Sequence, residues 1–306
     1  MTATAHATTP PHPGTPVLHP HGLPRPGRTL VMGVVNVTPD SFSDGGLSYA
    51  ADAAVAHGLA LLEQGADIVD VGGESTRPGA ARPPVEEELR RVLPVVRELA
   101  AAGAIVSVDT MRAEVAARAL DAGARLVNDV SGGIADPAML PLMARAGMPY
   151  VLMHWRGHAA GMQAKAVYDD VVTDVLDELR LRIDAALEVG VRPGCLVVDP
   201  GLGFAKTPEH NWELLGRLGD VVALGHPVLV GASRKSFLGS LLADRTTGEP
   251  RPVRQRDAAT TAVSVLAAAQ GVWCLRVHDV ASTADAIRVT ARWGVDAAAS
   301  ARSPRS

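Results

Sequence analysis

The feature that most constrains the fold is an eightfold alternation of short apolar segments, each ending in polar or glycine-rich residues, with amphipathic helical segments. A short continuous apolar run bounded by turn residues predicts a strand buried on both faces, and strands that alternate with helices predict a parallel sheet. The predicted strands begin near residues 29, 67, 104, 125, 150, 195, 227 and 272, and the predicted helices span 50–65, 85–102, 111–122, 137–146, 168–189, 208–218, 256–270 and 281–293.

Eight strand–helix units can form either a closed barrel or an open, doubly wound sheet. An open sheet that binds a dinucleotide should carry a GxGxxG turn after its first strand, and none follows residues 31–38. We therefore predict the α/β class, as a single-domain (β/α)8 TIM barrel over residues 29–296. Residues 1–28 are rich in Pro, His, Thr and Gly and predict a flexible N-terminal tail, and residues 297–306 predict a second disordered tail.

Composition excludes several other classes. The chain is 47% hydrophobic but only 3% aromatic, so its core must consist of Ala, Val, Leu and Ile. The net charge is −4 and the Lys and Arg residues are scattered, which argues against nucleic-acid binding. No apolar run is long enough to cross a membrane and no signal pattern stands at the N-terminus, so we expect a cytoplasmic protein. The two cysteines, Cys195 and Cys274, lack a CxxC spacing and predict a reduced compartment without a zinc site.

Polar residues stand at nearly every predicted strand end, where barrel enzymes assemble their active sites. Any single one could simply meet water at the surface, but together they predict a functional site. Arg276 and His278 are two residues apart, so they share one face of a strand and could bind one anion; Ser233 and Lys235 could do the same if the strand extends that far. The other strand ends carry Asn36, Asp109, Asn128, Asp129, His154 and Asp199.

Two long segments rich in Gly, Pro and Ser follow the first and second predicted strands. Such segments are either surface connections or lids over a site. Apolar Phe42 and Pro78 within them favour lids, and the polar lid candidates are Asp40, Asp44, Glu74, Thr76 and Arg77.

Eight motifs in chain order resemble the dihydropteroate synthases, over about residues 29 to 296: MGVVNVTPDSFSDGG, DVGGESTRPGA, SVDT, NDVSG, LMH, VVDPGLGFAKT, GASRKSFLG and RVHDV. GLGFAKT with NW downstream is similar to the actinobacterial branch. The resemblance implies a transferase of folate biosynthesis and a target of sulfonamides. In its reaction, 4-aminobenzoate displaces diphosphate from (7,8-dihydropterin-6-yl)methyl diphosphate to give 7,8-dihydropteroate. It also implies a homodimer.

Carried over motif by motif, the resemblance implies three substrate regions. A buried carboxylate can accept two hydrogen bonds from the aminopyrimidinone edge of a pterin, and an amide can supply complementary groups. The pterin would be bound by Asp109, Asn128, Met153, Asp199 and Lys235. The diphosphate would be bound by Asn36, Arg276 and His278, with Asn36 also on Mg2+, which prefers oxygen ligands. The 4-aminobenzoate would be bound by Phe42, Thr76, Arg77, Pro78, Phe204 and Ser236, with its carboxylate near the helix start at Ser236.

The implied chemistry is a dissociative displacement, because a reduced pterin can delocalise positive charge as diphosphate departs. Asp109, Lys235, Arg276 and His278 are the expected catalytic residues, with Asp109 facing the cation. His154 is expected to hydrogen-bond locally rather than to contact substrate, and Trp155 and Arg156 have no assigned role. The alternatives are a non-catalytic pterin-binding homologue, a methyltetrahydrofolate-type methyltransferase domain and, more distantly, a phosphate-binding barrel isomerase.

Overall fold

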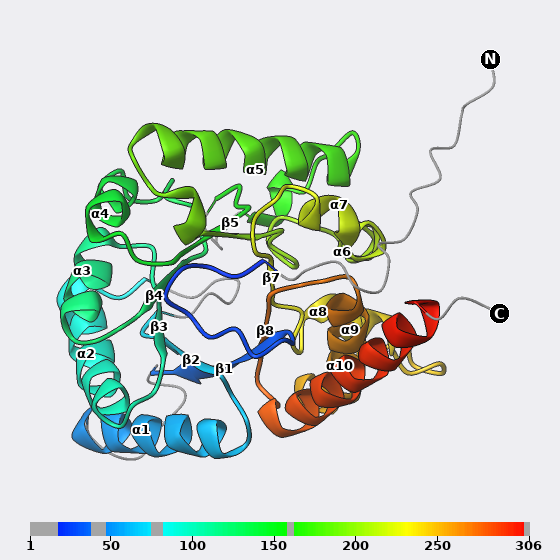
Figure 1. Cartoon of the computed structure of the whole chain (residues 1–306), viewed down its shortest axis with the longest axis horizontal. Helices are drawn as coiled ribbons and strands as arrows, with labels where there is room; N and C mark the ends of the chain where they lie inside the picture. The colour runs from blue at the N-terminus through cyan, green and yellow to red at the C-terminus, as the bar shows by residue number, and fades with distance from the viewer. Residues whose placement is uncertain (1–17, 38–46, 75–81, 158–161, 303–306) are drawn as a thin grey trace.

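A computed structural model describes residues 18–37, 47–74, 82–157 and 162–302, and it consists of parallel strands surrounded by helices (Figure 1). The strands are β1 Leu30–Asn36, β2 Ile68–Gly72, β3 Val106–Asp109, β4 Leu126–Asp129, β5 Tyr150–Met153, β6 Leu196–Asp199, β7 Leu229–Val230 and β8 Cys274–Val277. The helices are α1 Leu47–Glu63, α2 Val85–Ala101, α3 Ala113–Asp121, α4 Met139–Ala146, α5 Val171–Glu188, α6 Pro208–Gly216, α7 Leu218–Val222, α8 Ser236–Leu241, α9 Asp257–Ala269 and α10 Val280–Arg302.

The strands pair in the order β6-β5-β4-β3-β2-β1-β8-β7, and every pair is parallel. The two ends of this order meet through an isolated parallel bridge between Val198 and Val228, where the Val198 amide donates to the carbonyl of Pro227 at 2.9 Å. This contact joins β6 to the start of β7 and brings the sheet close to full closure. The predicted (β/α)8 barrel is therefore confirmed.

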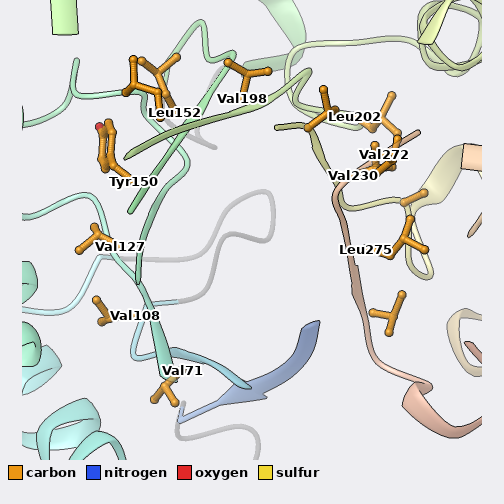
Figure 2. Packing of buried hydrophobic residues seen from close by; sticks show 14 of the residues in the cluster. Val71, Val108, Val127, Tyr150, Leu152, Val198, Leu202, Val230, Val272 and Leu275 are labelled. Carbon is orange, nitrogen blue, oxygen red and sulfur yellow. The ribbon is translucent and has the colours of Figure 1, made fainter. Parts of the chain in front are cut away.

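Alternate residues of each strand face opposite sides of the barrel wall. On β1, Val31 and Val35 belong to the large cluster packed against the helices, whereas Leu30 and Met32 belong to a smaller cluster inside the barrel. Figure 2 shows part of the outer cluster, including Val71 on β2. This alternation decides which polar residues near the strand ends point inward.

The segment before β1 packs against the N-terminal end of the barrel. Leu23 is buried in the inner cluster with Leu30 and Trp273, and the amide of His21 donates to the carbonyl of Gly194 at 2.8 Å. The prediction that the whole of 1–28 forms a flexible tail is therefore wrong for residues 18–28, and residues 1–17 lie outside the described residues. Local composition did not reveal this packing because the contacts that bury Leu23 come from distant parts of the chain.

Some predicted boundaries also differ from the structure. The predicted helix 208–218 is divided into α6 and α7, and the short helix α8 was not among the predicted helices. Helix α10 continues to Arg302, past the predicted end at 293 and into the predicted C-terminal tail. Among the described residues, no helix is long and apolar enough to span a membrane.

Candidate active site

Polar side chains from several strands converge at the carboxyl ends of the parallel strands, the end where barrel enzymes place their chemistry. The strands position them because inward-facing residues recur every second position, as at Ile68, Asp70 and Gly72 on β2. Most of these side chains are nearly inaccessible to solvent even though they are polar. The buried polar residues in this layer are Asp70, Asp109, Asn128 and Asp199.

Arg276 on β8 lies between two carboxylates. Its Nε donates to Oδ2 of Asp70 at 2.6 Å, and its Nη2 donates to Oδ2 of Asp109 at 2.7 Å. The same Oδ2 of Asp70 accepts a hydrogen bond from Nδ2 of Asn128 at 3.0 Å. Four strands, β2, β3, β4 and β8, therefore meet in one hydrogen-bonded cluster, and the orientations of the guanidinium and of the Asn128 amide are both set by Asp70.

Within this cluster, Asp109 is a weaker acid than an ordinary aspartic acid. Burial raises the pKa of its carboxyl to about 7; the Arg276 guanidinium opposes that shift, whereas the carboxylate of Asp70 adds to it. The carboxyl groups of Asp70 and Asp109 therefore share the guanidinium of Arg276 in an environment with little access to solvent. A positive charge that develops on a ligand beside Asp109 would favour its ionised form, and the carboxylate would in turn stabilise that charge.

Asp199 and Lys235 form a second charged part of the site. Burial raises the pKa of Asp199, opposed first by the nearby ammonium of Lys235, and Oδ1 of Asp199 accepts a hydrogen bond from the amide of Gly201 at 2.7 Å. Burial lowers the pKa of Lys235 to about 8. Its ammonium contacts the carbonyl of Leu202 and lies 4.8 Å from the centre of the Phe204 ring, a cation–π contact.

Met153 and Phe204 border this polar region with apolar surface. Met153 on β5 is buried in a small cluster with Met111 and Val130, and Phe204 packs against the same cluster. A flat ring bound between the polar groups and this cluster would find hydrogen-bond partners at its edge and sulfur and aliphatic groups at its face.

His278 follows β8 and is oriented by Ser233. Ser233 Oγ lies 2.9 Å from Nδ1 of His278, and the same Oγ accepts a hydrogen bond from the His278 amide at 3.2 Å. The Ser233 hydroxyl therefore contacts both the backbone and the ring of His278 and fixes the orientation of the imidazole. Strand β7 ends at Val230, so Ser233 and Lys235 do not share a strand face as proposed from their spacing, and the Ser233–His278 contact arises from the loop instead.

Arg234, in the loop that carries Ser233, holds this loop through contacts behind the site. Arg234 adopts a left-handed backbone conformation with φ 59°, which is uncommon for a residue with a side chain. Its guanidinium forms a bidentate ion pair with Asp257 at 2.6 and 2.7 Å, and its amide donates to Oγ1 of Thr260 at 3.1 Å. Ser236 is exposed at the first residue of α8.

Of the remaining predicted site and lid residues, some belong to the described part of the chain and the others do not. Asn36 is the last residue of β1, half-buried and in register with Gly72 of β2. Glu74 pairs with Arg82 at 2.8 Å. The other lid candidates lie outside the described residues: Asp40, Phe42, Asp44, Thr76, Arg77 and Pro78.

Sequence reasoning missed two residues in or beside the site. Asp70 stands inside a predicted strand and received no role, although the two-residue period from Gly72 would have pointed it inward. Lys206 lies in the GLGFAKT motif without an assigned function, yet its side chain is buried. His154, expected to hydrogen-bond locally, contacts Lys206 and Glu178.

Among the residues that the structure describes, acidic and histidine side chains do not gather into a conventional metal site. In the described ranges, no group of three or more His, Cys, Asp or Glu side chains could hold a metal ion. A metal bound to these residues would therefore take most of its ligands from a substrate and from water.

Comparisons with known proteins agree with this geometry. Residues 32–278 match the family model described as "Pterin binding enzyme". The chain is 57% identical to dihydropteroate synthase of Mycobacterium leprae over 264 residues, which covers 86% of this chain and 93% of that protein. Among solved structures, it is similar to dihydropteroate synthase of Xanthomonas albilineans with 4-aminobenzoic acid, with a TM-score of 0.80, 47% identity and coverage of 89% and 94% of the two chains.

The structure of the Xanthomonas albilineans protein in complex with 7,8-dihydropteroate is also similar, with a TM-score of 0.77, 45% identity and the same coverage. The family model spans most of the chain, and the mycobacterial relative supports an actinobacterial-like sequence. This chain belongs to the dihydropteroate synthase family of pterin-binding enzymes.

Proposed function

We propose that this chain is a dihydropteroate synthase, which condenses (7,8-dihydropterin-6-yl)methyl diphosphate with 4-aminobenzoate to form 7,8-dihydropteroate and diphosphate in folate biosynthesis. One observation carries the proposal: buried carboxylates and an amide meet cationic side chains at a single end of the barrel. The acidic groups suit the N–H donors of a pterin, and the cations suit a diphosphate.

The pterin would bind between Asp199, Asn128 and Lys235. The carboxylate of Asp199 accepts hydrogen bonds from the aminopyrimidinone edge, and Lys235 donates one to a ring oxygen or nitrogen. Because Nδ2 of Asn128 donates to Asp70, the carbonyl oxygen of the Asn128 amide is turned away from Asp70. Asn128 then offers the ligand an acceptor and its second amide proton. Met153 supplies apolar contact to the ring face.

The diphosphate would bind to Arg276 and His278, with Asn36 nearby at the end of β1. A magnesium ion fits this donor set if phosphate oxygens and water provide its other ligands, because the amide oxygen of Asn36 is the one ligand proposed from the chain. When bound, Mg2+ would neutralise part of the negative charge on the departing diphosphate.

In the reaction, the bond between the exocyclic methylene carbon and the diphosphate oxygen breaks, and the electron pair leaves with diphosphate. The cation that remains is delocalised over the reduced pterin and faces Asp109, while Arg276 and His278 hold the departing anion. The neutral arylamine nitrogen of 4-aminobenzoate then forms the new bond to carbon, and the proton that it loses passes to solvent. No strong base is needed before attack, so orientation of the amine is the main requirement.

The 4-aminobenzoate would lie against Phe204 and Ser236. The residues that would close over it, Phe42, Thr76, Arg77 and Pro78, lie outside the described residues. We expect sulfonamides to compete with 4-aminobenzoate, and substitution of Phe42 or Pro78 to alter that competition. A titration without competition would contradict this placement.

The direct test is turnover by the purified chain with both substrates and Mg2+, with dihydropteroate and diphosphate measured in the same samples. A known dihydropteroate synthase run in parallel serves as the positive control. Equal amounts of the two products support the proposal. A chain that binds the pterin but forms neither product would instead be a non-catalytic homologue.

We further propose a cytoplasmic homodimer. Cys195 and Cys274 are buried free thiols, as expected in a reducing compartment. Large apolar side chains are exposed on and between α8, α9 and α10, which lie together in Figure 1, and they would be covered by a second copy. These residues are Leu241, Val253, Leu266, Val289 and Trp293. Sedimentation of the chain and of Leu266→Glu tests this, and a monomer at every concentration of the unchanged chain would refute it.

A further inference from the structure

The loop between β6 and α6 contains a lysine whose charged end is buried. The side chain of Lys206 points back under its own loop, and the residue is only 3% exposed. Its Nζ lies 3.0 Å from the carbonyl oxygen of Gly201, 3.1 Å from that of Phe204 and 3.0 Å from Nδ1 of His154. A protonated amine has three N–H donors, so each donor has an acceptor, and two of the acceptors belong to the loop itself.

The ring of His154 connects Lys206 to helix α5 on the outside of the barrel. Because Nδ1 accepts from a cation, the proton of the neutral ring lies on Nε2 and is donated to Oε2 of Glu178 on α5, at 2.9 Å. Burial and the charge of Lys206 lower the pKa of His154 to about 4. Although burial raises the pKa of Glu178, hydrogen bonds from His154 and Arg156 outweigh it and lower the value to about 2. Burial also lowers the pKa of Lys206, to about 7, so below that pH a neutral ring lies between a cation and an anion.

A second contact from the α5 side holds the same loop. The hydroxyl of Tyr168 donates to the carbonyl of Ala205 at 3.0 Å, and the guanidinium of Arg156 lies 3.8 Å from the centre of the Tyr168 ring. Ala205 has a left-handed backbone with φ 46°, a conformation that is unfavourable for a residue with a side chain. External contacts must therefore hold the loop in its observed shape.

The loop carries two groups of the proposed site. Asp199 stands at its start and receives the amide of Gly201, whose carbonyl is bound by Lys206. Phe204, whose carbonyl is also bound by Lys206, places its ring beside the Lys235 ammonium. The conformation of this one loop thus sets the position of the Asp199 carboxylate relative to the Phe204 ring.

We propose that Lys206 is a positioning residue: its buried ammonium, supported by His154 and Glu178, holds the β6–α6 loop so that Asp199 and Phe204 keep their places in the active site. This inference rests on the proposed function for its meaning, because these two residues are the ones assigned to the pterin and to 4-aminobenzoate. In the proposed arrangement Lys206 itself touches neither substrate and acts through the loop.

A graded pair of variants tests the donors separately from packing. Lys206→Gln keeps two N–H donors but loses the charge, and Lys206→Met keeps the apolar stem but no donor. We expect kcat/KM to fall about 100-fold in Lys206→Met, the size of effect that a misplacement of roughly 1 Å produces, with Lys206→Gln between it and the unchanged chain. The dissociation constant for the pterin diphosphate, measured by calorimetry, should rise in the same order.

Lys165→Met is the matched control, because Lys165 is an exposed lysine and its side chain takes no part in this network. It should keep unchanged kinetics and affinity. If both Lys206 variants bind and turn over within twofold of the unchanged chain, the proposal is wrong. If Lys206→Met does not fold, Lys206→Gln decides the matter, and wild-type kinetics in that variant overturn the proposal.

Two readouts separate this inference from the proposed function. Calorimetry reports pterin affinity even if the unchanged chain proves inactive, so loss of turnover and loss of positioning are distinguishable. In the unchanged chain, nuclear magnetic resonance of the His154 ring should find the proton on Nε2 and a titration near pH 4. A ring that titrates near its usual value would contradict the network without any substitution.

Discussion

Asp70 is the residue whose replacement tests the site most severely. Its carboxylate is fully buried and accepts from Nε of Arg276 at 2.6 Å and from Nδ2 of Asn128 at 3.0 Å. It therefore supports one side chain assigned to the diphosphate and one assigned to the pterin, while contacting neither ligand in the proposed arrangement. Substitution should impair catalysis as well as stability.

The size of the effect follows from the contacts that are lost. In Asp70→Asn a neutral acceptor replaces a charged one, and charge-assisted hydrogen bonds are about twice as strong as neutral ones, so we expect a loss of about 1.4 kcal/mol, or about tenfold in kcat/KM. Asp70→Leu removes both hydrogen bonds. Removing one partner of a buried pair lowers the free energy of unfolding by about 3 to 5 kcal/mol, and the lower end applies because Arg276 keeps Asp109 and its side chain is 22% exposed. Because Arg276 and Asn128 both lose the contact that orients them, and a misplacement of roughly 1 Å can cost about 100-fold, we expect kcat/KM to fall about 100-fold.

The assay is steady-state turnover with both substrates, with urea denaturation of each variant to measure the free energy of unfolding. Asp67→Asn is a matched control, because Asp67 also pairs with an arginine, Arg28, at 2.7 and 2.9 Å, but at the opposite end of β2. It should lose some stability and keep kcat/KM. A folded Asp70→Leu variant whose kcat/KM lies within threefold of the unchanged chain would refute the reasoning.

Three further predictions concern other parts of the molecule. Because the pKa of Lys235 is lowered by burial to about 8, its ammonium is lost as pH rises through that value, so kcat/KM should decline above about pH 8; in Lys235→Arg only the decline due to Lys206, whose pKa burial lowers to about 7, should remain, and a flat profile to about pH 10 in the unchanged chain would contradict this. Tyr150→Phe should lower the free energy of unfolding by about 2 kcal/mol, because the buried hydroxyl donates to Oδ2 of Asp129 at 2.7 Å, and chemical denaturation measures the change. Leu23→Ala should cost about 2 to 3 kcal/mol in the same experiment, whereas a flexible segment at residues 18–28 would predict no change.

The repeating pattern of the chain was enough to predict the barrel and the end that carries the site. Strand–helix alternation is a local signal, since it depends on the periodicity of apolar residues within each segment. Residues at strand ends, such as Asp109, Asn128 and Arg276, could be expected near one another because parallel strands of a barrel present their carboxyl ends at one face.

Tertiary structure alone decided which of those groups touch and what supports them. Asp70 holds Arg276 across 206 positions of sequence, a contact set by the pairing of β1 with both β2 and β8. The burial of Lys206 and its three acceptors follow only from the tertiary structure, which brings His154 of another strand against its loop. Leu23 looked like part of a tail, but it fills the end of the barrel. Periodicity reports which way a residue faces within its own element, whereas burial and partners depend on how distant elements are brought together.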